Sequence, residues 1–546
     1  MRLPDRASPV SLFLFFAALS SLTRALLFVA PPLSDEPVHL LGSWVWQHGG
    51  RLYVDFVDNK PPLLYAYYAL AQLPFDGGLS AVRLVTVLAW IPLTALAASA
   101  YYAHRPAGVV AGTLYLVAAA SFVIDEGLAV NTEVLMLLPA ALAFVSLVRM
   151  RELDAGRRAL VAGAWLGIAA LFKVTAVLWL PAIPAMAWRI ARPGARWSAA
   201  TRATGLALAG LSLPLAAAAL AFHVHDSARE LVEWSLLRNL AYVAAPVEPA
   251  EAFKRAATGA VGWMAVTLPL WWTAWRPLPR PSGDVSRWLA AALALLAMPA
   301  VVMGWRFFAH YYLQVLFPLC LAAAPVVAGW LEPLREDPAS TGSTPRTSAG
   351  DERHCEDPAS AGLTRARPPQ AGGRRVVGAW FAWMATAFAA FALFNAWVVF
   401  GRNDVLESRR HVYNDVAAWL RSDLCAEPRT LFVWGREPMF YVASRLRPAS
   451  RFVLPQETLS GYVPGRQSTS AAGRVVANTG RDWDTLMADL ERSRATYVLD
   501  TAPSGLHGWG VYKLWNYPRL FLYLRDHYDQ AAVIDNVVVY RRRDCR

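Results

Sequence analysis

Long apolar runs recur along this chain, and they restrict its fold more than any other feature. About 20 apolar residues suffice to cross the hydrocarbon core of a bilayer as a helix. Of the 546 residues, 56% are hydrophobic and 17% are charged, whereas about a quarter of a typical soluble protein is charged. The runs cover residues 10–30, 80–102, 107–124, 134–148, 159–172, 174–188, 203–222, 257–275, 288–304, 311–331 and 376–400. We therefore predict a polytopic α-helical membrane protein with about 11 transmembrane helices.

The first apolar run is predicted to stay in the protein as a transmembrane helix. It is longer than the apolar region of a secretory signal peptide, and Arg24 interrupts it. Pro31 and Pro32 follow it, and they suit the end of a helix better than a cleavage site. We therefore count residues 10–30 as the first span.

Positive charge alternates between the loops that join these runs, and the formal net charge is +12. Arginines cluster after the fourth, sixth, eighth and tenth runs, at Arg149, Arg151, Arg157, Arg158, Arg189, Arg192, Arg196, Arg202, Arg276, Arg280, Arg287 and within 332–375. The loops between these clusters are poor in basic residues, with none between Asp125 and Glu133. By the positive-inside rule the N-terminus is cytoplasmic, and the predicted spans place residues beyond 400 outside the cytoplasm. The basicity therefore indicates orientation in the plasma (inner) membrane and not a nucleic-acid partner.

The composition divides the chain into four segments. Residues 1–331 form the transmembrane body, which has a long first outer loop at 31–79. Residues 332–375 are rich in Pro, Ser, Thr, Gly and Arg, and we predict a disordered cytoplasmic loop there. Residues 376–400 are the last span, and residues 401–546 alternate strand patterns with amphipathic helical patterns. We predict that this last segment is an extracytoplasmic α/β domain with a mostly parallel sheet.

The four cysteines are too few for a disulfide scaffold. Cys425 and Cys545 both fall in the predicted outer domain, where an oxidising compartment would permit a disulfide. From the sequence, a disulfide and two free thiols both stay open.

The first outer loop is long, aromatic and rich in charged residues. Amphipathic stretches at 37–47 and 62–73 predict helices that lie at the membrane surface. Asp35 and Glu36 follow the first span directly, and Lys60 precedes two prolines. Asp35 suits the N-terminal cap of the following helix, and it also suits a reactive carboxylate. Both interpretations stay open at this point.

Further charged residues are predicted at the same membrane boundary. Glu133 opens the fourth span, where acids tend to be functional. Lys173 lies between two apolar runs, and it could serve the site or extend to the interface by snorkelling. In the stretch GWRFFAHYYLQ, Arg306 and His310 would share one helix face if that segment were helical. Tyr311 could belong to an aromatic belt.

Acids and cations therefore gather at one predicted face of the membrane, and Arg24 inside the first span is a further candidate. Glycosyl transfer from a lipid-linked phosphosugar requires both kinds of group. A carboxylate takes the proton from an acceptor hydroxyl, and cations neutralise the departing phosphate. Proton abstraction alone would need no lysine or arginine, and binding of a lipid phosphate alone would need no buried acid.

The stretch SDEPVHLLGSWVWQHGGRLYVDFVDNKPPL resembles the first extracytoplasmic loop of GT-C glycosyltransferases. It is most similar to the bacterial branch related to protein O-mannosyltransferases and the lipid A aminoarabinose transferase. The stretches NTEVLML, FKVTA and RFFAHYYLQ support the resemblance, as do FVWGREPMFYVASRLRPASRF and YPRLFLYLRDHY in the C-terminal segment. The likeness covers nearly the whole chain apart from 332–375.

The resemblance implies a GT-C fold and inverting transfer of a sugar from a polyprenyl-phosphate donor to an acceptor hydroxyl on a glycan, lipid or protein. It implies that Asp35 is the catalytic base, that Glu36 is its acidic neighbour, and that Glu133 fills a second acidic position where many relatives have Asp. The residues expected to contact the donor phosphate or its carrier are Lys60, Lys173, Arg306 and His310, with Tyr311 and Arg24 as further candidates. Some relatives bind a divalent metal, but only scattered Asp, Glu and His residues would support one here. We therefore predict no cofactor and leave a divalent metal open.

Two other functions fit a membrane protein of this composition. A transporter or flippase of a lipid-linked glycan would also need acids and cations inside a helical body. Transporters often show two matching halves with charges near the bilayer midplane, whereas the sequence shows no such duplication. A membrane anchor that carries an α/β binding module would leave the long first loop unexplained. The C-terminal segment also lacks a glycine-rich nucleotide loop, which disfavours a nucleotide-sugar donor.

Overall fold

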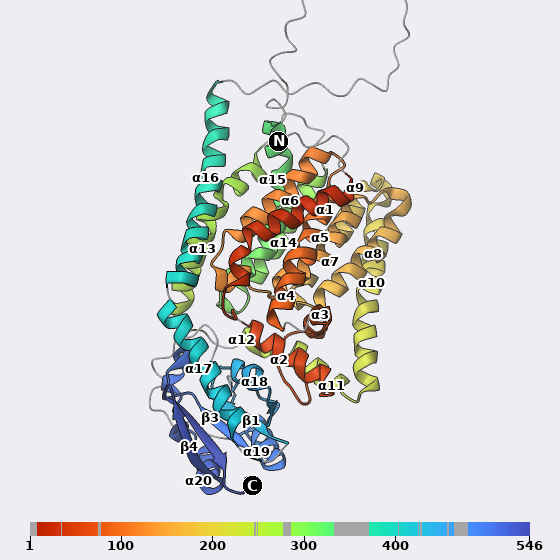
Figure 1. Ribbon diagram of the computed structural model, residues 1–546. Coiled ribbons are helices and arrows are strands. Elements are labelled where there is room, and N and C mark those ends of the chain that lie inside the picture. Colours follow the sequence, from red (N-terminus) through yellow and green to blue (C-terminus); the bar gives the residue numbers. More distant parts are fainter. Residues whose placement is uncertain are drawn as a thin grey trace, which may run out of the picture.

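The computed structural model describes residues 8–33, 35–74, 78–244, 247, 249–276, 285–331, 371–401, 403–423, 425, 428–455, 458–462 and 479–545. The chain forms a helical body with a smaller α/β domain at one end (Figure 1). The predicted cytoplasmic loop at 332–375 lies outside the described residues except for its last five, which begin the helix α16.

The body is almost entirely helical. Its α-helices are α1 (Pro9–Thr23), α2 (Glu36–Gln47), α3 (Pro62–Gln72), α4 (Leu79–Val85), α5 (Ile91–Tyr101), α6 (Arg105–Ala120), α7 (Thr132–Val148), α8 (Ala155–Ala170), α9 (Ala182–Ile190), α10 (Arg196–Val224), α11 (Ala228–Val232), α12 (Arg238–Ala244), α13 (Pro249–Trp275), α14 (Val285–Val302), α15 (Leu313–Leu331) and α16 (Ala371–Ala396). Short 3₁₀ or π turns join or extend them at η1 (Ala25–Phe28), η2 (Thr86–Trp90), η3 (Ile124–Leu128), η4 (Glu152–Asp154), η5 (Val174–Trp179), η6 (Pro193–Ala195), η7 (Glu233–Leu237), η8 (Met303–Trp305), η9 (Ala309–Tyr312) and η12 (Trp397–Gly401).

Each predicted apolar run coincides with helical structure, because only a helix satisfies its own backbone groups within lipid. Stretches long and apolar enough to cross a membrane are Leu79–Tyr101, Pro193–Val224, Val285–Trp305, Ala309–Leu331 and Arg375–Gly401. Shorter apolar helices are Pro9–Thr23, Arg105–Ala120, Thr132–Val148 and Val174–Ile190. The chain is therefore an integral membrane protein, while the number of eleven spans and their orientation stay predictions.

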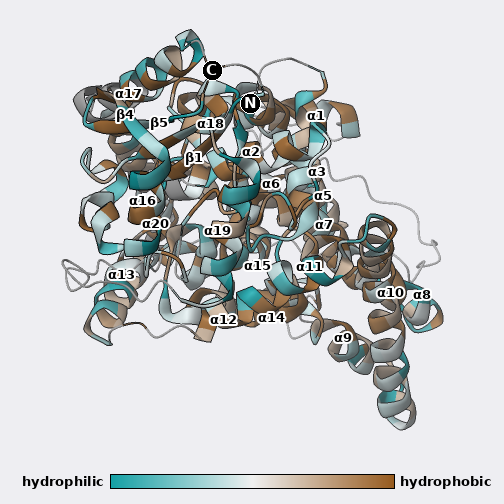
Figure 2. Cartoon of the chain, turned by 90° about the horizontal axis from the view of Figure 1, so that it is seen from below, coloured by the Kyte–Doolittle hydropathy of each residue, from teal (hydrophilic) through white to brown (hydrophobic). Residues whose placement is uncertain are grey.

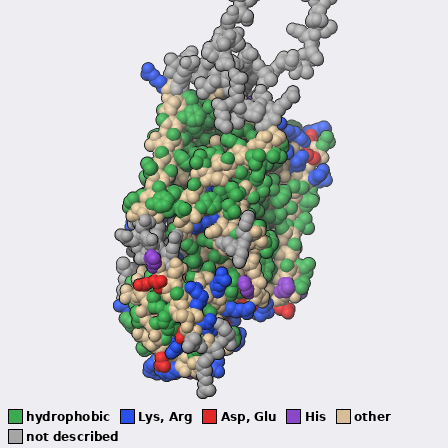
Figure 3. Space-filling view, in the orientation of Figure 1, with side chains coloured by type: hydrophobic (Ala, Val, Ile, Leu, Met, Phe, Trp, Pro, Cys, Tyr) green, Lys and Arg blue, Asp and Glu red, His purple; other side chains and the backbone are tan. Residues whose placement is uncertain are grey.

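The outer surface of the body is apolar. Figure 3 shows hydrophobic side chains over most of its visible face, with charged side chains gathered towards its ends and on the α/β domain. Hydrophobic residues recur along α8 and α10 (Figure 2). In the most apolar window of the stretch that contains α10, only 11% of residues are buried inside the protein. This exposure suits a helix whose surroundings are lipid chains.

Helices α8 and α10 approach one another through glycine. A Cβ added at Gly163 would collide with the backbone carbonyl of Ala207, and one added at Gly210 would collide with that of Leu160. Small residues at such positions let helix backbones pack closely where no hydrophobic effect drives association.

The C-terminal domain contains a five-stranded sheet with helices packed around it. Its elements are α17 (Asn403–Ser422), β1 (Thr430–Trp434), α18 (Met439–Ser444), β2 (Arg447–Pro448), α19 (Arg481–Ser493), β3 (Tyr497–Asp500), η14 (Leu506–Val511), η15 (Leu514–Asn516), α20 (Pro518–His527), β4 (Tyr528–Ile534) and β5 (Val537–Arg542). The strand order is β2-β1-β3-β5-β4. Strand β1 runs parallel to β2 and β3, with Phe432 opposite Val498, and β5 runs antiparallel to β3 and β4.

The prediction of an α/β domain is thus confirmed in class, but a mostly parallel sheet is wrong. The sheet is mixed because β4 and β5 form a hairpin. Asp535 and Asn536 make its turn with φ values of 49° and 63°. Asp and Asn tolerate this left-handed conformation better than most residues, and turns of this kind match the twist of paired strands.

A disulfide joins Cys425 to Cys545, whose Cα atoms lie 5.5 Å apart. The sequence left this pairing open. The bond ties the end of the chain back to the segment between α17 and β1.

The α/β domain docks on the first loop and on the helices before α13. The backbone N–H of Val57 donates to the carbonyl of Arg451 at 3.1 Å, and Val57 packs into the hydrophobic core of the domain. The guanidinium of Arg238 makes two hydrogen bonds to Asp482, at 2.7 and 2.9 Å. Arg481 extends in the other direction and pairs with Glu233 at 3.0 Å. These contacts fix the domain over the loop that carries Asp35.

Candidate active site

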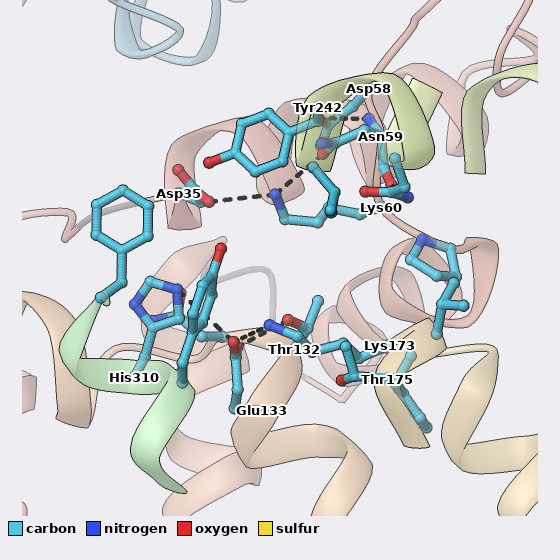
Figure 4. A pocket seen from close by; sticks show the side chains of 18 of the residues that line it. Asp35, Asp58, Asn59, Lys60, Thr132, Glu133, Lys173, Thr175, Tyr242 and His310 are labelled. Carbon is cyan, nitrogen blue, oxygen red and sulfur yellow. Dashed lines mark hydrogen bonds and ion pairs between the residues drawn. The ribbon is translucent and has the colours of Figure 1, made fainter. Parts of the chain in front are cut away.

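A cavity of about 400 Å³ lies where the first loop, the helical body and the α/β domain meet (Figure 4). Its walls come from the segments around α2, α3, α7, η5, α12 and η9 and from the loops after β1 and β2. The polar and aromatic side chains that line it are Asp35, His39, Asp58, Asn59, Lys60, Asn131, Thr132, Glu133, Phe172, Lys173, Thr175, Asn239, Tyr242, Phe308, His310, Tyr311, Arg436 and Tyr462. Of the predicted site residues, Asp35, Lys60, Glu133, Lys173, His310 and Tyr311 are among them.

Asp35 stands at the start of α2, but its side chain makes no capping hydrogen bond to that helix. Its carboxylate instead faces Lys60, with Oδ2 3.5 Å from Nζ (Figure 4). Lys60 reaches this position because Pro61 and Pro62 turn the chain directly behind it into α3. The capping interpretation therefore does not account for the Asp35 side chain, which is open to the cavity.

The electrostatics of this pair favour its charged form. Burial by itself raises the pKa of the Asp35 carboxyl, but the nearby positive charges, chiefly that of Lys60, lower the pKa below its ordinary value. Burial lowers the pKa of Lys60, whereas Asp35 and Asp58 raise it above the ordinary value of lysine. Asp35 is thus held as an unprotonated carboxylate, which is the form that a general base needs.

Glu36 has a different environment from its neighbour. Its side chain is fully buried, and it pairs with Arg83 at 2.5 Å. It also accepts hydrogen bonds from the backbone N–H groups of Leu33 and Val130, at 2.9 and 3.0 Å. Arg83 in turn donates to carbonyls of the segment after α1, including that of Ala30 at 2.7 Å. We expected Glu36 in the cavity, but it does not line it. It is instead a positioning residue, which holds together the three segments around Asp35.

Glu133, Lys173 and His310 form a second charged group on the opposite wall. The Lys173 ammonium donates to Glu133 Oε1, and His310 Nε2 lies 3.6 Å from the same oxygen. The Thr132 hydroxyl donates to the other Glu133 oxygen at 2.8 Å. Lys173 also lies over the ring of Tyr311, 4.2 Å from its centroid.

The path of the chain explains why Lys173 enters the cavity. Helix α8 ends at Ala170, and Lys173 follows in an extended conformation before η5 begins. This break turns the side chain inward, and it is 17% exposed. Snorkelling to the membrane surface, the alternative for Lys173, is therefore wrong.

Arg306 and His310 would share a helix face only if their segment were one continuous helix, and the structure shows that it is not. The backbone leaves the helical conformation at Gly304, Trp305 and Phe307, with φ values of 72°, 56° and 50°. Arg306 is buried and stacks on Tyr242, with 4.5 Å from its guanidinium carbon to the ring centroid. It supports the cavity wall from behind instead of lining it.

Arg24 also lies away from the cavity. It is buried between α1 and α6, where it donates to Thr23 Oγ1 at 3.0 Å and to the carbonyl of Leu116 at 3.4 Å. We therefore do not retain Arg24 as a ligand of a donor phosphate.

Several cavity residues were not predicted from the sequence. Asp58 accepts a hydrogen bond from the Tyr65 hydroxyl at 2.7 Å, and Asn239 donates to the carbonyl of Asn59 at 2.6 Å. His39 is buried one turn after Asp35 on α2, and burial lowers the pKa of its ring, so it is neutral near pH 7. The spacing of four residues from Asp35 was a signal for His39. No local sequence pattern marks Asn239, which lies some two hundred positions after Asp35 in the chain.

Among the residues that the structure describes, no three His, Cys, Asp or Glu side chains gather in a way that could hold a metal ion.

Comparison with known proteins finds similarity in structure only. No family model matches the chain, and no curated protein matches it in sequence. ArnT from Cupriavidus metallidurans bound to undecaprenyl phosphate superposes with a TM-score of 0.53 at 13% identity, over 97% of each chain. The apo state of the same protein gives 0.52 at 12% identity, again over 97% of each chain.

A further solved structure is the archaeal oligosaccharyltransferase AglB from Archaeoglobus fulgidus, in complex with an inhibitory peptide and a dolichol-phosphate. Its TM-score is 0.45 at 12% identity, over 98% of this chain and 74% of that one. The similarity to ArnT spans nearly the full length of both chains, and it confirms the GT-C fold that the sequence motifs led us to expect.

Proposed function

We propose that this chain, which has the fold of the ArnT structures, is an inverting glycosyltransferase. It moves a sugar from a polyprenyl-phosphate donor to an acceptor hydroxyl at the outer face of the membrane. The observation that carries this proposal is the placement of the Asp35 carboxylate in one cavity with Lys60, Lys173 and His310. The fold adds support, since ArnT has been solved with undecaprenyl phosphate bound.

The chemistry follows from the roles that these groups can fill. Asp35 takes the proton of the acceptor hydroxyl, and the acceptor oxygen forms a bond to the anomeric carbon. The bond between that carbon and the phosphate oxygen breaks on the opposite side, which inverts the configuration. Its electron pair stays on the phosphate, and the cations Lys60 and Lys173 stabilise the added charge. Glu133 holds Lys173 and His310 in place by the contacts described above.

Two features support an extracytoplasmic site. The Cys425–Cys545 disulfide suits an oxidising compartment. By the positive-inside rule, the distribution of arginines also supports a location outside the cytoplasm for this end of the molecule. The acceptor classes compatible with this location are envelope glycans, lipids and proteins.

The test has two stages. Mass spectrometry of glycolipids and glycoproteins from a deletion strain and its parent identifies the sugar that is lost, and thereby the donor and acceptor class. Purified protein is then assayed for transfer with Asp35→Asn, which should reduce turnover by about 100- to 10,000-fold because the base is lost. Asp55→Asn is the matched control, since Asp55 lies in the same loop and pairs with Arg51 away from the cavity.

Full transfer by Asp35→Asn would remove Asp35 as the base. Movement of an intact lipid-linked glycan across vesicles, without any transfer product, would instead support the transporter alternative.

A further inference from the structure

The loop after β1 carries Arg436, a cationic cavity residue that takes no part in the steps proposed above. Arg436 lies at the carboxyl end of a central parallel strand of the α/β domain, which is where open sheets of this kind commonly bind ligands. It lines the cavity together with Leu454 and Tyr462 of the same domain. The two neighbours of Arg436 in the chain are firmly held, and this makes its position well defined.

Gly435 packs directly against Thr501, because a Cβ at Gly435 would collide with the Thr501 side chain. Glu437 is buried and accepts a hydrogen bond from the Tyr413 hydroxyl. The ring of His507 lies 2.5 Å from the other Glu437 oxygen. The loop is thus fixed on both sides of Arg436, whose guanidinium lies over the ring of Tyr462, 4.2 Å from the centroid.

Arg436 also differs from the lysines of the cavity in its charge balance. Lys60 pairs with Asp35, and Lys173 pairs with Glu133. Within the described part of the chain, no carboxylate lies within ion-pair distance of Arg436, and its buried Nε has no hydrogen-bond partner in the protein. A planar guanidinium with free donors matches the geometry of a phosphate.

We propose that Arg436 binds the phosphate of the polyprenyl carrier and neutralises the charge that this phosphate gains during transfer. The inference rests on the proposed function. In the donor the phosphate is a diester with one negative charge. When the anomeric carbon–oxygen bond breaks, the electron pair stays on the phosphate, and a second negative charge develops there as the acceptor proton moves to Asp35. The α/β domain is therefore part of the reaction site, because it supplies this cation.

The test measures binding of two lipids to the full-length protein in detergent. One is undecaprenyl phosphate, and the other is undecaprenol, which has the same chain and no phosphate. Arg436→Ala should weaken binding of undecaprenyl phosphate by about 10- to 100-fold, as expected for loss of hydrogen bonds to a charged group. Its affinity for undecaprenol should stay within about twofold, since no charge is involved. Arg436→Lys should give an intermediate loss, because it keeps the charge without the two-pronged geometry.

The control variant is Arg525→Ala, since Arg525 lies on the exposed surface of the same domain and pairs with Asp526. Unchanged affinity of Arg436→Ala for undecaprenyl phosphate would overturn the assignment of Arg436. An equal loss for both lipids would also overturn it, because it would indicate a structural defect. If the wild-type protein binds the phosphate no more tightly than the alcohol, the proposed function itself fails.

Discussion

The contact between Asp35 and Lys60 makes a quantitative prediction about pH. Replacing Lys60 by Gln removes the charge nearest to the Asp35 carboxylate while keeping a polar side chain of similar length. At 3.5 Å, two unit charges interact by about 1 kcal/mol at the dielectric constant of water and by about 5 kcal/mol at an effective value of 20. The side chains are 28% and 44% exposed, so water screens the pair and the lower part of this range applies.

Loss of about 1 to 2 kcal/mol of interaction with the lysine raises the pKa of Asp35 by about 1 unit or slightly more. The pKa rises because the lysine charge and a proton compete for the Asp35 carboxylate. Without the lysine the protonated acid is favoured, so at a given low pH a larger fraction of the enzyme lacks its base. The acid limb of the pH profile should therefore move up by about 1 pH unit in Lys60→Gln.

The assay is the pH dependence of kcat/KM for transfer, which reports ionisation in the free enzyme. Loss of a phosphate contact also lowers the amplitude of the profile, but it does not move the midpoint of the acid limb. Arg51→Gln is the control, since Arg51 pairs with Asp55 in the same loop and lies outside the cavity. An acid limb that stays in place, or that moves down, would refute the assignment of Asp35 as a base whose charge Lys60 stabilises.

Three further predictions concern stability, measured by thermal unfolding of the full-length protein in detergent. Glu36→Gln should lower the free energy of unfolding by about 3 to 5 kcal/mol, because it leaves the buried Arg83 without its charged partner. The control Glu152→Gln removes an exposed ion pair and should cost less than about 1 kcal/mol. Equal effects of the two substitutions would contradict the positioning role of Glu36. Gly210→Ala should lower the free energy of unfolding by about 1 to 3 kcal/mol, because the added Cβ pushes α10 away from α8. The control Gly205→Ala lies in the same helix, where a Cβ meets nothing within 4 Å, and it should be neutral or stabilising. Burial raises the pKa of Asp500 from its ordinary value near 4 to about 6, so the α/β domain should lose up to about 3 kcal/mol of stability as pH rises from about 4 to above 6. Asp500→Asn should abolish that pH dependence, and a variant that keeps it would exclude Asp500 as the cause.

The apolar runs made the helical body predictable from sequence. Within lipid a backbone segment has almost no alternative to the helix, so hydropathy alone located the elements. Topology then placed Asp35, Lys60, Glu133, Lys173 and His310 at one end of the body, and the structure brings them into one cavity.

The errors have a common physical origin in contacts between distant parts of the chain. Glu36 is an acid next to Asp35 in the chain, and contacts with Arg83 of α4 and with the backbone N–H of Val130 separate their roles. Arg306 looked like a partner of His310 because no proline in the sequence marks the break at Gly304. Arg436 is separated from Asp35 by some four hundred positions, and no local pattern marks it.

The long sequence separation within the cavity has a consequence for how the protein is made. The residues that line it extend from Asp35 to Tyr462, and a chain emerges from the ribosome with its N-terminal part first. The carboxylate and both lysines are inserted early, but the wall that carries Arg436 exists only after the last span has entered the membrane and the domain behind it has folded. A nascent chain stalled before that point holds an incomplete reaction chamber. If the proposed function holds, activity should therefore begin only once the α/β domain has folded against the first loop.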